Sequence, residues 1–534
     1  MNKEQKQFIF ILSIITVIGA IIRIISCYWG YPLQLHPDEP TIVNNVVDML
    51  RRHSWEAFVY NRPDQFEIKC NAILFSIISW IKFHVPAYET FKDYTMMYYL
   101  IARGFTSMFG IALIPLSALV VGKIVEGIEI NKRCTQYAVA LLIAFSSIFV
   151  QHSAYATPDI PLTFFVVLFS YFFIEYLERG ELKDFIICSI IIGISVTIKY
   201  PAIILSVPLA FMVIYREYLY TKKYLKILKY AVFSIFIILF VMFVIAPNLF
   251  TDLTNVIKLI KHEARPTHLG ADGLGFFGNL FYYLKMVIEN LGYISIIPFI
   301  LGIVAIFKNK SVKKYVFLVG LIYWICVSVL SLHHLRWGIP MYAFYIFIVA
   351  IGLGYILSFQ NIKFSKVIFV CGIIINIIIL LNVFLSGICI TKCSRLPNTI
   401  YLSKTFFEVN KINKDDVLYE GYTIFAPNDY NPIVPNLFEF VDGQITPINK
   451  YLSKKYFIMS HSHSSRYFRE SKRYSYEVSI YNAITSNYEL VYQLKPDGYY
   501  SQKSFTLNNI FYSIKYIFSK YHSTGSTISI YKLK

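Results

Sequence analysis

The chain has 534 residues, of which 56% are hydrophobic and only 15% are charged. A soluble protein of this length carries roughly a quarter charged residues. Here the apolar residues gather in many runs near twenty residues long, the length a helix needs to cross a bilayer. The composition therefore excludes a soluble globular protein and predicts an α-helical protein that crosses the membrane many times. The formal net charge of +18 does not indicate nucleic-acid binding, because no basic stripe lies on a soluble motif and Lys and Arg collect in the cytoplasmic loops of membrane proteins.

The first apolar run, residues 8–27, follows Lys3 and Lys6 and admits two interpretations. Its last four residues, 24–27, resemble a lipoprotein processing box, so a cleaved signal is one of them. We favour an uncleaved first span, because the run is long enough to cross the bilayer and many further runs follow it.

Hydropathy and turn residues predict about eleven spans. They lie near residues 8–27, 94–121, 135–151, 160–177, 185–198, 201–215, 230–247, 291–307, 315–331, 339–357 and 367–390. With the N-terminus inside, the loops 216–229 and 308–314 are cytoplasmic and rich in Lys, whereas the outer loops 152–159 and 332–338 hold one Lys or Arg between them. This asymmetry is typical of membrane proteins and predicts that the chain beyond the last span lies outside the cytoplasm.

Two long segments, 28–93 and 248–290, are expected on the outer side and are too irregular to cross the membrane. Residues 72–85 are apolar but short for a span, and we interpret them as a helix lying in the membrane interface. If they cross instead, the number of spans becomes even and the assignment of sides downstream reverses.

After the membrane domain, 1–390, the sequence predicts a small soluble α/β domain over 391–534. The pattern favours a helix at 399–411. Strands are expected at 416–420, 456–460, 489–493 and 527–532.

Ionisable residues at membrane depth are costly and are therefore candidates for function. With the topology above, all of the candidates fall on the outer side. They are Asp38 and Glu39 after the first span, Arg103 in the second, Asp159 at the start of the fourth, Lys199 between the fifth and sixth, His262, Arg265 and His268 in the second long outer segment, and His333, His334 and Arg336 before the tenth. A carboxylate can accept a proton from an attacking hydroxyl, and cations can hold a phosphate. The set therefore suits a reaction on an anionic lipid head group.

Each candidate also has a purely structural interpretation. Asp38 and Glu39 fit the first turn of a helix, and Asp159, which lies among prolines, fits a turn. Arg103 and Lys199 can anchor the chain at the membrane interface, and histidines are common in polar loops. We favour function because the carboxylates and the cations occur together on one side.

Several short elements occur in an order that a known family shares. They are Asp38-Glu39 in the first outer loop, Lys69 before the interfacial helix, Ala102-Arg103, Tyr155 to Leu162, Thr197 to Tyr200, and Arg336 with Pro340. Over most of residues 1–410 this set resembles the C-type glycosyltransferases, and more closely glycosyltransferase family 39, which includes protein O-mannosyltransferases, with the related aminoarabinose transferases of lipid A. The chain departs from the family's Lys-Pro-Pro-Leu stretch at 70–72, and it lacks the Trp-Trp-Asp signature of oligosaccharyltransferases.

The resemblance implies that a sugar moves from a polyprenyl-phosphate carrier to an acceptor outside the cytoplasm, with inversion at the anomeric carbon. Asp38 is then the general base, Glu39 positions Arg103 or the acceptor, and Asp159 is a second acidic group near the acceptor. The candidates for the donor phosphate are Lys69, Arg103, Lys199, Arg265 and Arg336, and the candidates for contacts with substrate or metal are His262, His268, His333 and His334. A divalent metal held by Asp38, Asp159 and a histidine is left open, because family members differ in this respect, and no other cofactor is expected.

The implied partners are the lipid-linked sugar donor, the bilayer of the cell membrane and an acceptor that the sequence does not identify. The alternative is a transporter or a flippase for lipid-linked glycans, which shares the spans and the buried charges. Such a protein normally needs ionisable groups near the bilayer centre and access from both sides. The gathering of charges on one side favours the enzyme. A receptor that binds glycans through residues 391–534 does not need these charges in its spans.

Overall fold

A computed structural model describes residues 2–220, 222, 224–263, 274–330, 333–358, 365–424, 440–441, 444–445 and 454–534. The chain divides into two compact units. Unit 1 comprises residues 1–27, 38–391 and 502–517, and unit 2 comprises residues 28–37, 392–501 and 518–534.

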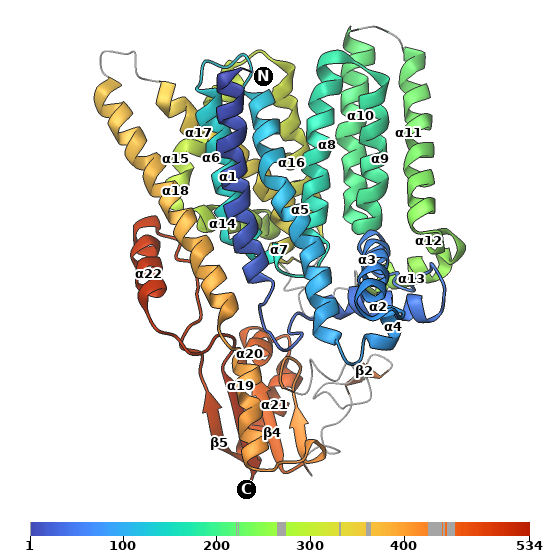
Figure 1. The fold of residues 1–534 in the computed structure, drawn as a ribbon, viewed down its shortest axis with the longest axis vertical. Coiled ribbons are helices and arrows are strands. Elements are labelled where there is room, and N and C mark those ends of the chain that lie inside the picture. The colour runs from blue at the N-terminus through green and yellow to red at the C-terminus, as the bar shows by residue number, and fades with distance from the viewer. Residues whose placement is uncertain are drawn as a thin grey trace. The chain divides into compact units, whose positions relative to one another are not determined.

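Unit 1 is a bundle of long apolar helices (Figure 1). Eight stretches of the described chain are long and apolar enough to cross a membrane, or up to ten if each of two bent pairs is one span. The eight stretches are α1 (Lys3–Ser26), α5 (Thr95–Ile124), α8 (Asp159–Arg179), Tyr200–Tyr218 with η1 (Tyr200–Leu205) and α10 (Ser206–Ile214), Leu225–Ile245 in α11 (Tyr224–Ile245), Val312–Val329 with η4 (Val312–Val316) and α16 (Phe317–Val329), Leu335–Ile356 with η5 (Leu335–Gly338) and α17 (Ile339–Ile356), and Phe369–Arg395 in α18 (Ser365–Arg395). The bent pairs join α6 (Lys132–Phe145) to α7 (Ser147–Ser153) and α14 (Gly275–Leu291) to η3 and α15 (Tyr293–Ser295 and Ile296–Lys308). The chain is thus a multi-pass membrane protein, as the sequence predicts.

Two differences separate these spans from the eleven expected. Helix α9 (Leu182–Ile198) packs beside α8 and α11 and is not among these stretches, although its 17 residues are at the lower end of the length that a crossing requires. The segment 248–290, expected on the outer side and too irregular to cross the membrane, is helical in its described part, which contains α12 (Asn248–Thr251), α13 (Leu253–Glu263) and α14. Helix α14 turns by 102° into the next helix, and this bend hides it from a search for straight apolar runs.

Short helices lie at one end of the bundle, where α2 (Glu39–Arg51), α3 (Gln65–Phe83) and α4 (Ala87–Thr90) meet (Figure 1). Helix α2 is amphipathic and buries its apolar face, including Val43, Val46 and Met49. Helix α3 starts earlier than the expected interfacial helix. Its apolar residues Ile73, Ile77, Trp80 and Ile81 are exposed, and their spacing puts them on one face of the helix.

A network of ion pairs joins the ends of several other helices. Lys313 lies 2.8 Å from Glu126 and 2.9 Å from Glu178, and Arg179 lies 3.1 Å from Glu175. Lys313 belongs to the loop 308–314 that the sequence assigns to the cytoplasm, so acidic residues partly balance the positive charge of this Lys-rich loop.

Unit 2 is built on a four-stranded sheet with the order β1-β4-β6-β5. Strand β1 (Val417–Tyr419) is parallel to β4 (Tyr456–Ser460), and β6 (Ile528–Leu533) is antiparallel to both β4 and β5 (Tyr488–Leu494). The helices are α19 (Thr399–Val409), α20 (His461–Arg469) and α21 (Ser475–Asn487), and a separate pair is formed by β2 (Phe440–Val441) and β3 (Gln444–Ile445). The predicted helix at 399–411 and the four predicted strands are confirmed to within three residues at each end.

Helix α22 (Thr506–Phe518) belongs almost entirely to unit 1, although it lies within the range expected for the soluble domain. Its Asn509 is buried and donates hydrogen bonds to Asn382 at 2.9 Å and Ser386 at 3.0 Å on α18. A buried amide of this kind has to be satisfied by polar partners, and these bonds attach α22 to the bundle.

Candidate active site

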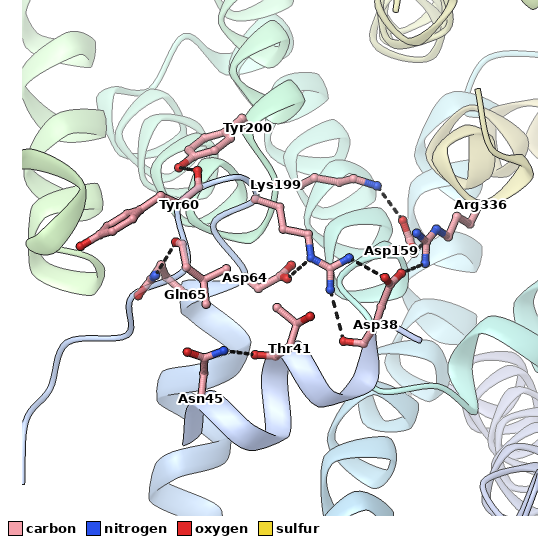
Figure 2. Close-up of polar contacts among 12 residues, drawn as sticks. Asp38, Thr41, Asn45, Tyr60, Asp64, Gln65, Asp159, Lys199, Tyr200 and Arg336 are labelled. Atoms are coloured by element: carbon pink, nitrogen blue, oxygen red, sulfur yellow. Dashed lines mark hydrogen bonds and ion pairs between the residues drawn. The ribbon is translucent and has the colours of Figure 1, made fainter. Parts of the chain in front are cut away.

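Asp38, the residue just before α2, lies between two arginines. Its Oδ1 is 3.0 Å from Nη1 of Arg62, and its Oδ2 contacts Nη1 of Arg336 (Figure 2). Arg62 also donates a hydrogen bond of 3.2 Å to the Asp38 carbonyl. The side chain is about one-fifth exposed, at 19%, so the carboxylate can be reached from outside the protein.

Asp159, the first residue of α8, lies on the other side of Arg336. Its Oδ1 accepts a hydrogen bond of 2.9 Å from Nζ of Lys199, and its Oδ2 is 3.9 Å from Nε of Arg336 (Figure 2). Lys199 follows the last residue of α9 and lies 5.0 Å from the ring centre of Trp337. Four residues that are far apart in the sequence, Asp38, Asp159, Lys199 and Arg336, therefore meet at one place.

The contacts of Asp38 decide between two interpretations of this residue. A helix-capping aspartate accepts a hydrogen bond from a backbone N–H in the first turn. Asp38 occupies the N-cap position of α2, but its side chain makes no such bond. Its oxygens face Arg62 and Arg336 instead, so helix capping does not explain the residue.

Sequence reasoning missed two members of this cluster, Arg62 and Asp64. Nε of Arg62 lies 2.7 Å from Asp64, which is buried and has a left-handed backbone with a φ of 45°. Burial alone lowers the pKa of Arg62, but the negative charges of Asp64, Asp38 and Asp159 outweigh it and raise that pKa. Burial raises the pKa of the Asp64 carboxyl, and the charge of Arg62 opposes this shift. In the sequence the two residues occur as Arg-Pro-Asp at 62–64 in the long outer loop, where charged residues and prolines are ordinary.

Glu39, the residue after Asp38, forms a second ion pair with Arg103, and both side chains are fully buried. Two hydrogen bonds, Nε to Oε1 at 2.8 Å and Nη2 to Oε2 at 2.7 Å, join Arg103 to Glu39. Glu39 Oε1 also accepts a hydrogen bond of 2.9 Å from the N–H of Ala156, and Arg103 donates a hydrogen bond of 2.8 Å to the carbonyl of Cys27. Paired, two-point contacts of this kind fix geometry well. The pair holds the start of α2 against the loop that leads into Asp159.

Arg103 and Lys69 were both expected at the donor phosphate, and the structure places them elsewhere. The guanidinium of Arg103 is completely buried on Glu39 and the Cys27 carbonyl. Lys69 is buried beside α2, where Nζ contacts the carbonyl of Trp55 and lies 5.2 Å from its ring centre. Neither side chain presents its charge to the cluster at Asp38.

The histidine candidates are dispersed. The ring of His333 lies 4.4 Å from that of Tyr282, and the ring of His334 lies 5.1 Å from that of Trp337, next to Arg336. His262 is exposed near the end of α13. Arg265 and His268 lie outside the described residues.

A divalent metal does not fit the described part of this site. Among the described residues, no group of three or more His, Cys, Asp and Glu side chains is placed to hold a metal ion. The two carboxylates that would supply ligands, on Asp38 and Asp159, face arginine and lysine side chains instead. We therefore derive no chemical step through a metal.

The geometry supports acid–base chemistry on an anionic substrate. Three carboxylates, on Asp38, Asp64 and Asp159, alternate with three cations, on Arg62, Lys199 and Arg336. Charges held this close in a partly buried site interact strongly. Removing them from water costs free energy that can exceed this attraction, so stability alone does not explain the cluster. A cluster of interacting ionisable groups of this kind is a candidate functional site.

Comparisons with known proteins agree with the resemblance stated from the sequence. Residues 128–250 match the family model described as dolichyl-phosphate-mannose-protein mannosyltransferase. The structure is similar to the oligosaccharyltransferase of Archaeoglobus fulgidus in the apo form, with a TM-score of 0.54 and 12% identity over 92% of this chain and 73% of that chain. The same protein in complex with zinc and sulfate gives a TM-score of 0.52 and 12% identity over 93% and 73%.

A weaker likeness, with a TM-score of 0.47 and 11% identity over 91% and 96% of the two chains, is to ArnT from Cupriavidus metallidurans bound to undecaprenyl phosphate. No curated protein matches the sequence. The predicted fold, an α-helical polytopic membrane protein with a small C-terminal α/β domain, is confirmed, and the chain shares its fold with the archaeal oligosaccharyltransferase.

Proposed function

We propose that the protein is a membrane glycosyltransferase that takes a sugar from a polyprenyl-phosphate carrier and transfers it, with inversion, to an acceptor hydroxyl outside the cytoplasm. The observation that carries the proposal is the meeting of Asp38 and Asp159 on the single guanidinium of Arg336, with Arg62 and Lys199 beside them. The match of residues 128–250 to a family named for a dolichyl-phosphate-mannose donor supports it.

The donor phosphate is assigned to Arg336, Arg62 and Lys199. Guanidinium groups bind phosphate oxygens at two points, and the ammonium of Lys199 adds a third positive charge. All three cations are paired with carboxylates in the structure. An arriving phosphate competes for them, so its binding loosens the hold of Arg62 and Arg336 on Asp38.

This exchange prepares Asp38 to act as the general base. A carboxylate held by two arginines is a weak base, because the positive charges stabilise its ionised form. Once the phosphate shares those charges, Asp38 can accept the proton of the acceptor hydroxyl while the oxygen attacks the anomeric carbon. The bond from the sugar to the phosphate breaks, and the arginines stabilise the charge that the leaving phosphate gains.

Asp159 and Glu39 then have supporting roles. Asp159 holds Lys199 toward the phosphate through their 2.9 Å hydrogen bond and adds a negative charge on the acceptor side. Glu39 never reaches the substrate, since it is buried under Arg103 and Ala156. It positions the residues on both sides of the site.

The acceptor is a hydroxyl of a lipid, a glycan or a protein, and the reaction belongs to the cell envelope. The Trp-Trp-Asp signature of oligosaccharyltransferases is absent from the chain, so the likeness of fold does not extend to the transfer of a glycan to asparagine.

The test is a transfer assay on the purified protein with a panel of polyprenyl-phosphate sugars. Release of polyprenyl phosphate that depends on an added acceptor and on Asp38 supports the proposal. Movement of the lipid-linked sugar across vesicles without any release of polyprenyl phosphate would instead identify the flippase.

A further inference from the structure

Unit 2 contains a buried carboxylate with three hydrogen-bond donors around it. Glu420 follows β1 and is completely buried. Its Oε1 accepts a hydrogen bond from the hydroxyl of Tyr481 and lies 2.9 Å from Nδ1 of His463. Its Oε2 accepts a hydrogen bond of 2.7 Å from the N–H of Ser460. Because Tyr481 and Ser460 both donate, Glu420 is best satisfied as a carboxylate, and Nδ1 of His463 then carries the proton.

This arrangement fixes the orientation of the histidine ring. A histidine whose Nδ1–H is held by a carboxylate presents its other nitrogen, Nε2, as a hydrogen-bonding group of defined direction. The residue His463 is only 8% exposed. Its Nε2 has no hydrogen-bond partner within the part of the chain that the structure describes. Nε2 is not among the buried side-chain atoms of the described chain that lack a partner, so it is open to solvent and can accept a hydrogen bond from a ligand hydroxyl.

The position of the pair in the sheet is the second observation. Strands β1 and β4 are parallel neighbours, and Glu420 and the helix with His463 follow their carboxyl ends. In α/β sheets, ligands bind in the crevice outside the carboxyl ends of parallel strands. The remainder of the sheet is antiparallel, so β1 and β4 form the one pair of this type among the described strands.

Aromatic and basic side chains surround the histidine. Its ring lies 5.5 Å from those of both Tyr422 and Tyr467, and Arg466 lies 5.3 Å from the ring centre of Tyr422. Tyr422 has a left-handed backbone with a φ of 63°, a strained conformation for a bulky residue that is found at functional sites. The segment 461–474 has four Arg or Lys residues and a single acidic one, Glu470.

We propose that unit 2 carries a binding site of its own for an acidic carbohydrate, at the carboxyl ends of β1 and β4. Nε2 of His463 bonds to a sugar hydroxyl, Tyr422 and Tyr467 contact the apolar face of the ring, and Arg466 pairs with a carboxylate or phosphate on the glycan. The site involves no residue of the cluster at Asp38 and does not depend on the reaction proposed for unit 1.

The experiment uses the full-length protein in detergent on an array of oligosaccharides, in which each carboxylated or phosphorylated glycan has a neutral counterpart. We expect acidic glycans to be bound more tightly than their counterparts. His463→Ala and Arg466→Ala should each weaken that binding by about tenfold or more, the effect of losing a hydrogen bond or ion pair to a charged group. His461→Ala is the matched control, because this residue lies on the same helix, is exposed and contacts Ser529.

A merely structural role for the Glu420–His463 pair makes a different forecast. His463→Ala then lowers the melting temperature and leaves glycan binding as in the unaltered protein, and Arg466→Ala changes neither quantity. That result overturns the proposal. Equal binding of acidic and neutral glycans also overturns it, as does binding to phosphatidylglycerol vesicles that Arg466→Ala abolishes while no glycan is bound. Transfer by unit 1 is measured separately, so failure of either proposal leaves the other intact.

Discussion

Replacing Asp38 by Asn tests the general base directly, because Asn keeps the shape of the side chain and cannot accept a proton at neutral pH. The residue is about one-fifth exposed and lies between Arg62 and Arg336. Its amide oxygen can still accept a hydrogen bond from either arginine. The change therefore removes the charge and the basicity of Asp38 and disturbs little else.

The expected effects on activity and on stability differ in size. Loss of a general base lowers turnover by roughly 10²–10⁴-fold, which corresponds to about 3–5 kcal/mol of the activation free energy. Loss of an ion pair costs up to about 1 kcal/mol at a surface and about 3–5 kcal/mol in a fully buried site. The partial exposure of Asp38 places the cost in folding free energy between these limits, at about 1–3 kcal/mol. A folded protein of much reduced turnover is expected.

The assay measures release of polyprenyl phosphate under saturating donor and acceptor, together with thermal unfolding in detergent. Asp48→Asn is the matched control, since Asp48 lies on the same helix and forms an exposed ion pair of 2.9 Å with Arg52. It should leave both quantities almost unchanged. Turnover within a few-fold of normal in Asp38→Asn would refute the role of Asp38 as the base, even if the enzyme class were correct.

Three further predictions concern the buried Glu39–Arg103 pair, the proposed phosphate site and the orientation of the chain in the membrane. Glu39→Gln should lower the free energy of unfolding by about 3–5 kcal/mol, because it leaves the charge of Arg103 buried without its partner; an unchanged melting temperature in detergent would contradict this. Arg336→Lys should raise the KM for the donor by about tenfold or more, since Lys cannot reach both Asp38 and Asp159, and a KM equal to that of the unaltered protein would remove Arg336 from the phosphate site. A reporter that is active only in the cytoplasm should be silent when fused after residue 395, and strong activity there would show that the predicted orientation is reversed.

The helices and strands were largely predictable because local sequence patterns determine them. Apolar runs marked the spans, and the strands expected at 456–460, 489–493 and 527–532 correspond to β4, β5 and β6. The exceptions have a geometric cause. Helix α14 is bent away from the next helix, and α22 leaves the soluble segment to bind α18 through Asn509. No local pattern encodes a bend or a contact between residues more than a hundred positions apart.

The site was predictable only in part, for a related reason. Asp38, Asp159, Lys199 and Arg336 were found because each is an ionisable residue near the outer end of a predicted span, and because each belongs to the ordered elements of the family resemblance. Arg62 and Asp64 occur in an outer loop in which polar residues are ordinary, so nothing in the sequence set them apart. Arg103 was selected by the same rule as Lys199, but a rule based on charge does not distinguish a residue that faces substrate from one that is buried on Glu39.

The buried bond network of Glu39 has a consequence for how such an enzyme can be altered. Glu39 binds both Arg103 and the backbone of Ala156, so the loop that ends at Asp38 and the loop that leads to Asp159 are clamped together. In the proposed mechanism two adjacent residues therefore have different roles: Asp38 takes part in the reaction, and Glu39 fixes the position of the residues around it. Attempts to give the proposed enzyme a new acceptor should leave this dipeptide and Arg62, which is assigned to the donor phosphate, intact and diversify the other residues of the neighbouring loop, which the clamp does not include.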